Sequence, residues 1–305
     1  MTTIHSRHYG WDNALPPAAE VESGSDVEFD VVDASGGQID ARSPREVLGS
    51  LDFDRINPVT GPIFVKGAKP GDTLEVEIRS LRTSRWGWTG IIPGFGLLAD
   101  EYPEPWLRIW DVDGSTATGI RGARVPVRPF PGTIGVALAE RGAHSIVPPR
   151  QNGGNMDIRH LVQGVRLLLP VWVDGALFSV GDTHAAQGDG EVCGTAIESP
   201  MGVALRFTVH RGMTLAAPQY VVPAWCAEQP DPRGYHVTTG IAEDLREAAR
   251  SATRHMVEHL TLRYAYSREE AYALCSVCVD LRISEVVDAP NWLVSAFLPL
   301  SVLAS

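Results

Sequence analysis

The chain has 305 residues, of which 44% are hydrophobic and 21% charged, so it is a globular protein long enough for one large domain or two smaller ones. Its formal net charge of −11 excludes nucleic acid as the main partner, because phosphate binding requires a surplus of Lys and Arg. The N-terminus lacks a secretory signal pattern, and the longest apolar run, Trp292 to Ala304, is too short to span a bilayer. With only four cysteines, we therefore expect a cytoplasmic protein without a membrane partner.

Up to about residue 210 the sequence predicts short strands separated by Gly and Pro. Segments 27–32 and 74–78 alternate apolar and acidic residues, which is the period of a half-buried strand. We expect further strands at 62–65, 133–137, 166–173, 177–184, 192–198 and 203–209. The polar N-terminus, with His5 and His8, is interpreted as flexible. The Gly-rich, aromatic segment 86–96 is typical of a surface loop.

After residue 235 the pattern becomes helical. Apolar residues from Ile241 to Leu260 follow helical spacing, and Thr238 or Thr239 is the expected N-cap. A capping box beginning at Ser267 predicts a second helix that carries Cys275 and Cys278 as buried structural thiols. Segments 282–287 and 293–298 are predicted to return as strands.

These elements predict a mainly β fold, sandwich-like or barrel-like, with a C-terminal α+β part. We expect residues 1–210 to form the β-rich domain that carries the functional loop. Residues 211–305 form the α+β part packed on it.

The polar residues that could carry chemistry lie between positions 152 and 198. A glycine-flanked turn presents Asn155 and Asp157. The apolar segment 177–184 then ends in Asp182 and His184, which point to the same side of an extended chain because they are two residues apart. The following loop continues through Gln187, Asp189 and Glu191.

Asp, Glu and His side chains on one loop are the ligands of a divalent cation site with open positions. Imidazole and carboxylate suit zinc, manganese or iron, and additional carboxylates or carbonyls suit calcium. The alternative is a structural turn, because Asp, Gly and Asn are ordinary turn residues and a single His in one is commonly a hydrogen-bonding group.

Other catalytic arrangements have weaker support. The sequence contains no Gly-x-Ser-x-Gly elbow, no phosphate-binding loop and no Gly-x-Gly-x-x-Gly fingerprint. Cys193 falls in a predicted strand and is interpreted as a small core residue rather than a nucleophile. Cys275 and Cys278 have the spacing of a metal pair but no second pair to complete it.

Seven segments in order resemble one known family. They are Asp33 to Gln38, Asn57 to Pro62, Gly67 to Asp72, Ile92 to Gly96, Gly153 to Asp157, Gly181 to Glu191 and Asp280 to Ser284. On these segments the chain resembles the acetamidase/formamidase family. The resemblance implies hydrolysis of short amides to ammonia and a carboxylate, assembly into a homodimer or higher homo-oligomer, and a divalent metal ion, with zinc as the first choice and calcium or another divalent ion as alternatives.

Together, the resemblance and the loop suggest a mechanism. Asp157, Asp182 and His184 would hold the cation, and Glu191, with Asp189 as the other candidate catalytic carboxylate, would move the proton. Asn155, Gln187 and Gln38 would donate hydrogen bonds to the substrate oxygen, while Trp86, Trp88 or Phe95 would close a small pocket. The alternatives are a hydrolase of ureido or amidine compounds and a non-catalytic, metal-stabilised protein that binds a small molecule.

Overall fold

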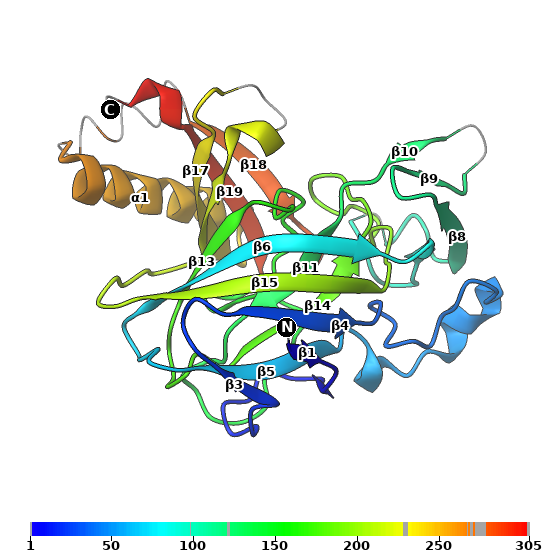
Figure 1. The fold of residues 1–305 in the computed structure, drawn as a ribbon. Coiled ribbons are helices and arrows are strands. Elements are labelled where there is room, and N and C mark those ends of the chain that lie inside the picture. Colours follow the sequence, from blue (N-terminus) through cyan, green and yellow to red (C-terminus); the bar gives the residue numbers. More distant parts are fainter. Residues whose placement is uncertain are drawn as a thin grey trace.

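The computed structural model describes residues 2–97, 99–120, 123–227, 231–266, 268, 271 and 279–303. Within them the chain folds into three β-sheets, with one long helix near the C-terminus (Figure 1). The mainly β fold with a C-terminal α+β part, predicted from the sequence, is confirmed.

The largest sheet has nine strands and runs through most of the molecule. Its long central pair, β6 and β15, is antiparallel and extends from the Thr73–His210 pair to the Thr83–Met201 pair. In spatial order the strands are β1 (Thr2–Ile4), β4 (Asp26–Val31), β15 (Met201–His210), β6 (Thr73–Thr83), β13 (Arg166–Pro170), β16 (Gln219–Val222), β17 (Tyr235–Ala242), β19 (Trp292–Pro299) and β18 (Asp280–Glu285).

A six-stranded sheet lies behind β4, β15 and β6 in Figure 1. Its members in order are β12 (Gly153–Asn155), β11 (Phe130–Gly135), β14 (Phe178–His184), β5 (Val59–Val65) and β2 (Arg7–His8), with β3 (Ala19–Val21) paired to β5. Every residue of β14 is buried, including the polar residues Asp182 and His184 at its end.

A smaller four-stranded sheet and several short helices complete the fold. The sheet contains β10 (Val125–Pro126), β9 (Thr116–Thr118), β8 (Trp106–Val112) and β7 (Trp86–Ile91). The long helix is α1 (Leu245–Tyr264), and the short 3₁₀ helices are η1 (Arg45–Ser50), η2 (Phe53–Arg55), η3 (Ala224–Cys226) and η4 (Leu300–Val302).

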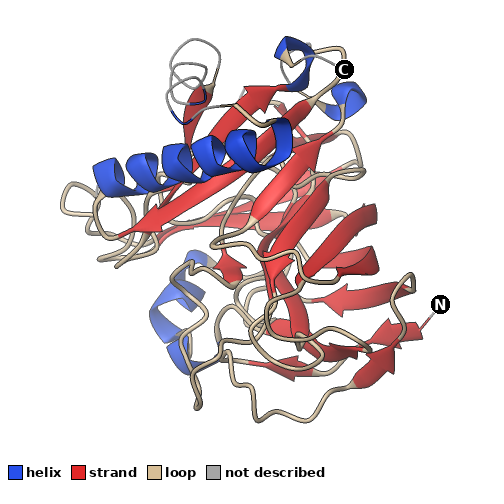
Figure 2. Cartoon of the chain, turned by 90° about the vertical axis from the view of Figure 1, so that its left-hand side faces the viewer, coloured by secondary structure: helices blue, strands red, loops and turns tan. Residues whose placement is uncertain are grey.

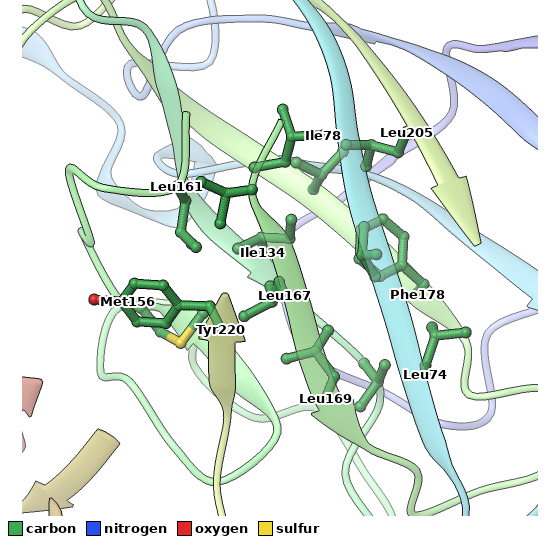
Figure 3. Close-up of a cluster of buried hydrophobic side chains, with 14 of the residues drawn as sticks. Leu74, Ile78, Ile134, Met156, Leu161, Leu167, Leu169, Phe178, Leu205 and Tyr220 are labelled. Carbon is green, nitrogen blue, oxygen red and sulfur yellow. The ribbon is translucent and has the colours of Figure 1, made fainter. Parts of the chain in front are cut away.

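The main hydrophobic core fills the space between the nine-stranded and six-stranded sheets. Inward-facing residues of β6 and β15, such as Ile78 and Leu205, meet Phe178 of β14 and Ile134 of β11 (Figure 3). Because strand side chains alternate between faces, one apolar face from each sheet is enough to build this layer.

Helix α1 packs on the outer face of β17 and β19 (Figure 2). Along β19, Val294 and Leu298 face the helix, whereas Leu293 and Phe297 face the main core. Strand β19 is therefore buried on both faces, and its sequence is nearly continuously apolar for that reason.

Several local predictions were wrong. The N-terminus is not free, because β1 and β2 pair it to both large sheets and His8 Nε2 lies 2.8 Å from Ser179 Oγ. Segment 86–96 contains strand β7, not only a loop, and segment 192–198 forms turns instead of a strand. Cys193 is accordingly a half-buried turn residue rather than part of a core strand.

The start of α1 also differs from the prediction. Thr238 and Thr239 lie in β17, and the helix is capped by Asp244, whose side chain accepts a hydrogen bond from Glu247 N at 2.9 Å. The predicted helix started too early because Ile241, whose apolar side chain fits the helical spacing, belongs to strand β17. Cys275 and Cys278 lie outside the described residues.

The boundary predicted near residue 210 stays a prediction, but no sheet stops there. Strand β13 of the first part pairs with β16 of the second, and both parts contribute to the main core. Among the described residues, no helix is long and apolar enough to cross a membrane.

Two leucines of α1 test how much the helix contributes to stability. Leu260 is fully buried against the sheet, whereas Leu262 is 80% exposed. We expect Leu260→Ala to lower the free energy of unfolding by about 2–5 kcal/mol, because it leaves a cavity in this layer. The Leu262→Ala variant should change it by less than about 0.5 kcal/mol. Urea denaturation measures both, and equal effects would contradict the described packing.

Candidate metal centre and active site

The end of β14 places two polar side chains deep in the molecule. On one side β11 pairs with it, setting Phe130 opposite His184 and Thr133 opposite Gly181. Strand β12 continues the sheet by setting Asn155 opposite Thr133, and Asp157 follows two residues later. Strand register thus brings Asp157, which is distant in the sequence, beside Asp182 and His184.

Three acidic residues of the site have a left-handed backbone. The φ angles of Asp157, Asp182 and Glu191 are 46°, 49° and 49°, a conformation that costs energy for residues other than Gly. Asp182 therefore does not lie on a regular extended chain as predicted, although its carboxylate still meets the His184 ring. Strained backbone of this kind is typical of positions where side-chain placement matters for function.

His184 is completely buried and surrounded by acidic groups. Its Nε2 atom lies 3.2 Å from Asp182 Oδ1, 3.1 Å from Glu198 Oε2 and 3.9 Å from Glu191 Oε1. Two sets of three potential ligands share this histidine, one with Asp182 and Glu198 and the other with Asp157 and Glu191. Within each set the ligand atoms lie within 4.8 Å of one another.

Gln187 orients the His184 ring rather than facing the cavity. Its Oε1 atom lies 2.8 Å from His184 Nδ1, and its Nε2 donates to the carbonyl oxygen of Asp157 at 2.9 Å. An amide oxygen can only accept, so Nδ1 carries the proton and donates. Once Nε2 loses its proton, its lone pair can bind a cation, and a metal-binding histidine is commonly held in this way.

Glu198 is a member of the site that the sequence did not single out. It lies directly opposite His184 across an isolated β-bridge, and its Oε1 accepts a hydrogen bond from Ala196 N at 2.7 Å. The segment before it looked like a continuous strand, so its carboxylate carried no separate signal. A glutamate between Ile197 and Ser199, both buried, was the available clue.

The C-terminal part supplies two further buried carboxyl groups, Glu285 at the end of β18 and Asp288 in the connection to β19. Asp288 Oδ2 accepts a hydrogen bond from Asn155 Nδ2 at 2.6 Å, and Glu285 Oε1 accepts one from Asp288 N at 2.5 Å. The loop after His184 is attached to the same region, because Gly190 N donates to Ser284 O at 3.1 Å. The site therefore requires residues from both parts of the chain.

Burial strongly shifts the pKa values of these acidic side chains. It raises the pKa of Asp157 to about 6, of Glu198 to about 8 and of Glu285 to about 8. Burial, followed by the charge of Asp157, also raises the pKa of Glu191 and of Asp288 well above the usual range.

Asp182 and His184 behave as an ion pair within this acidic surrounding. Burial opposes both charges and is the largest single effect on Asp182, but the charge of His184 and the hydrogen bonds of the carboxylate together lower the pKa of Asp182. Burial likewise opposes the imidazolium, yet Glu198 and Asp182 raise the pKa of His184 well above its usual value. One imidazolium cannot balance six buried carboxylates, so the site needs protons or another cation.

The residues present fit a divalent cation. No hydrogen-bond donor in the described part of the chain reaches either carboxylate oxygen of Asp157, although both are buried. Gly132 leaves room beside these groups, since a Cβ there would lie 2.7 Å from His184 Cε1. Nitrogen and oxygen donors of this kind are suited to zinc and related divalent ions.

A cavity of about 290 Å³ opens onto the acidic cluster. Its inner end is lined by Asn155, Asp182, Glu191, Glu198 and Asp288. Most of the other lining residues are apolar, with Ser35, Asn57 and Thr195 as the polar exceptions. The apolar residues include Trp88 and Phe95, two of the three aromatic residues proposed to close the pocket. The third, Trp86, is not part of this lining.

Two predicted site residues lie elsewhere. Asp189 is near Arg159 and Arg282, at 3.7 Å and 3.6 Å, and its side chain is 31% exposed and not part of this lining. Gln38 holds its own loop together, accepting a hydrogen bond from Asp52 N at 2.8 Å and donating to Ser35 O. Of the three proposed amide donors, only Asn155 lines the cavity.

Comparison with known proteins gives a consistent result. The model of the acetamidase/formamidase family matches residues 2–141 and 137–305. The chain is 29% identical to a formamidase of Methylophilus methylotrophus, covering 98% of this chain and 89% of that protein. It is also 29% identical to an acetamidase of Mycolicibacterium smegmatis, with 88% and 84% coverage.

A crystal structure of an acetamidase from Bacillus halodurans has the same fold, with a TM-score of 0.90, 32% identity and 98% coverage of both chains. Sequence and structure therefore agree over almost the full length, including the strands that assemble the buried acids around His184. The chain belongs to the acetamidase/formamidase family.

Proposed function

We propose that this chain hydrolyses short-chain primary amides to ammonia and a carboxylate, with a divalent cation held beside His184. The chain is an amidase by family, and its relatives include proteins named formamidase and acetamidase. The observation that carries the proposal is the set of buried carboxylates around His184 at the inner end of an open cavity. Amide hydrolysis needs such groups because the nitrogen must be protonated before it can leave.

His184 Nε2, Asp182 and Glu198 are the proposed ligands, since these three groups already converge on one point. A divalent cation bound there would polarise the amide carbonyl and lower the pKa of a water molecule. Gln187 keeps Nδ1 protonated and so directs Nε2 toward the ligand position. Zinc is the proposed metal, because imidazole nitrogen and carboxylate oxygen are both ligands that it accepts.

Glu191 is the proposed general base. It lines the cavity and is only 7% exposed, so it can meet both the substrate and a water molecule. A nearby cation would favour its ionised form, which burial otherwise disfavours. Glu191 takes one proton from the attacking water and passes it to the amide nitrogen. The C–N bond then breaks, ammonia leaves, and the water oxygen stays on the carbonyl carbon with its second proton. Dissociation of that proton from the carboxylic acid gives the carboxylate.

Asn155 is the proposed donor to the substrate oxygen. One N–H of its amide is directed at Asp288, which leaves the second for the substrate. Gln187 acts through His184, and Gln38 and Asp189 stay outside this mechanism because their groups are engaged elsewhere.

We further propose that the enzyme acts in the cytoplasm as a homodimer or larger homo-oligomer. The described cysteines Cys193 and Cys226 are free thiols, in keeping with a reducing compartment. Trp225 is 71% exposed, and an apolar side chain of this size is commonly covered by a subunit contact.

Metal content separates two ligand assignments. The sequence predicts Asp157 as the third ligand, and the geometry favours Glu198. We expect purified wild-type protein to contain a divalent metal, Glu198→Gln and His184→Ala to lose most of it, and Asp157→Asn to retain it. Elemental analysis after dialysis measures this, with circular dichroism as the control for folding. Loss of metal only in Asp157→Asn would reverse the assignment.

The role of Glu191 is tested by Glu191→Gln, which keeps the shape of the side chain but removes the base. We expect kcat for acetamide to fall by about 100-fold to 10,000-fold with metal content unchanged. Ammonia release from metal-replete protein is the measurement. Wild-type activity in this variant would exclude Glu191 as the base. Bound metal without turnover of any amide by the wild-type protein would favour the non-catalytic binding function.

The stability of cation-free protein should fall as pH rises from 6.5 to 8. Glu198 and Glu285 have folded pKa values of about 8, above those of the unfolded chain, so the unfolded state loses protons first and is favoured as pH rises. The lowered pKa values of His236 and His259 act in the opposite direction, but mainly below pH 6.5.

Thermal unfolding in the presence of a chelator measures this effect. We expect Tm to decrease over the interval, Glu198→Gln to flatten the decrease, and added zinc to restore Tm at pH 8. An increase of Tm with pH in the chelated wild-type protein would contradict the described electrostatics.

A further inference from the structure

We infer that, among the primary amides this site hydrolyses, those with an uncharged, apolar acyl group of about five to seven carbons are preferred over formamide and acetamide. This inference rests on the proposed function and adds a substrate class to it. It follows from the size, the lining and the polarity of the cavity that opens onto the acidic cluster.

The cavity is too large for the smallest amides. Its volume is about 290 Å³. With about 30 Å³ for a group the size of a water molecule, the four non-hydrogen atoms of acetamide take roughly 120 Å³. Acetamide would therefore fill less than half of the space. Hexanamide, at roughly 240 Å³, would fill most of it, and phenylacetamide, at roughly 300 Å³, would take all of it.

The two ends of the cavity differ in chemistry. Asp182, Glu191 and Glu198 line the inner end and are at most 7% exposed. Toward solvent the lining is apolar and formed by half-buried or exposed side chains, namely Leu51, Phe53, Ile56, Ile92 and Phe95. An amide group at the inner end would direct its substituent along this apolar wall.

Trp88, which lines the cavity beside this apolar wall, is held in place before a substrate binds. Trp88 is 2% exposed, and its Nε1 donates to Asp33 Oδ1 at 2.9 Å, which fixes the indole ring against the cavity. Ala34 and Ser35, which follow this aspartate, line the cavity beside it. A preformed apolar wall gains affinity from each added methylene, because little ordering of the protein is required.

The charges of the cavity lining and the leaving group of the reaction further restrict the substituent that the substrate can carry. No Lys or Arg is found among the described residues that line the cavity, so an anionic substituent would have no counter-ion beside four acidic groups. The leaving group proposed above is ammonia, so the substrate nitrogen carries no substituent. The apolar group must then belong to the acyl side.

The test compares kcat/KM for formamide, acetamide, butanamide, hexanamide and phenylacetamide on metal-replete protein. Each methylene buried on the wall should raise kcat/KM about fourfold, so hexanamide should exceed acetamide by on the order of 100-fold. The gain should lie mainly in KM, since the wall binds substrate and transition state alike. Values that stay flat or fall beyond acetamide would overturn the inference and leave the amidase function intact.

Two variants test the wall itself. Phe53→Ala removes an exposed lining ring, and Ala34→Leu fills part of the space; each should lower the hexanamide-to-acetamide ratio about tenfold. Leu262→Ala, on the outer surface of α1, is the control and should leave the ratio unchanged. A ratio unaffected by both lining variants would place the acyl group elsewhere.

A binding measurement separates failure of the inference from failure of the proposed function. Calorimetry on metal-replete protein, in which the cation is the counter-ion of the bound carboxylate, should show hexanoate binding at least tenfold more tightly than acetate, whether or not any amide is hydrolysed. If no amide is turned over but hexanoate is preferred, the hydrolytic proposal fails and the apolar subsite stands. Equal binding of the two carboxylates overturns the subsite, as does a preference for N-hexylacetamide over hexanamide.

Discussion

The burial of six carboxyl groups around one imidazole is the constraint on which this structure depends. Asp157, Asp182, Glu191, Glu198, Glu285 and Asp288 are all buried close to His184 or to one another. In a low-dielectric interior such a group of acids persists only if protons, hydrogen bonds or a cation compensate it. The raised pKa values and the unsatisfied oxygens of Asp157 show that the protein's own donors compensate it only in part.

The fold brings these carboxyl groups together from segments that lie far apart in the sequence. Strands β11, β12 and β14 pair with one another and position the residues around His184. The segment after His184 supplies Glu191 and Glu198. The end of β18 and its connection to β19 supply Glu285 and Asp288. Because the nine-stranded sheet continues from β13 into β16, the C-terminal part is held in register with the rest. An amidase site assembled from both parts requires this continuity.

The apolar wall of the cavity follows from the same arrangement. The carboxylates occupy its inner end, and the segments around Leu51 and Phe95 cover them with apolar side chains. Such a cover excludes water from the acids and strengthens their interaction with a cation. It also offers an uncharged surface to the part of the substrate that does not react, so the features that favour catalysis also restrict the substrate.

The sequence by itself determined the mainly β class, most strands of the two large sheets, the family and the loop from Gly181 to Glu191, because alternation and turn residues are local signals. Asp157, Asp182, His184 and Glu191 were found through glycine-rich segments of this kind. Only the tertiary structure decided that Glu198, Glu285 and Asp288 join them, and that Gln38 and Asp189 do not. A carboxylate in an apolar segment looks the same whether it lies in a strand or in a cluster. What separates the two is strand register and long-range pairing, which no window of local sequence contains.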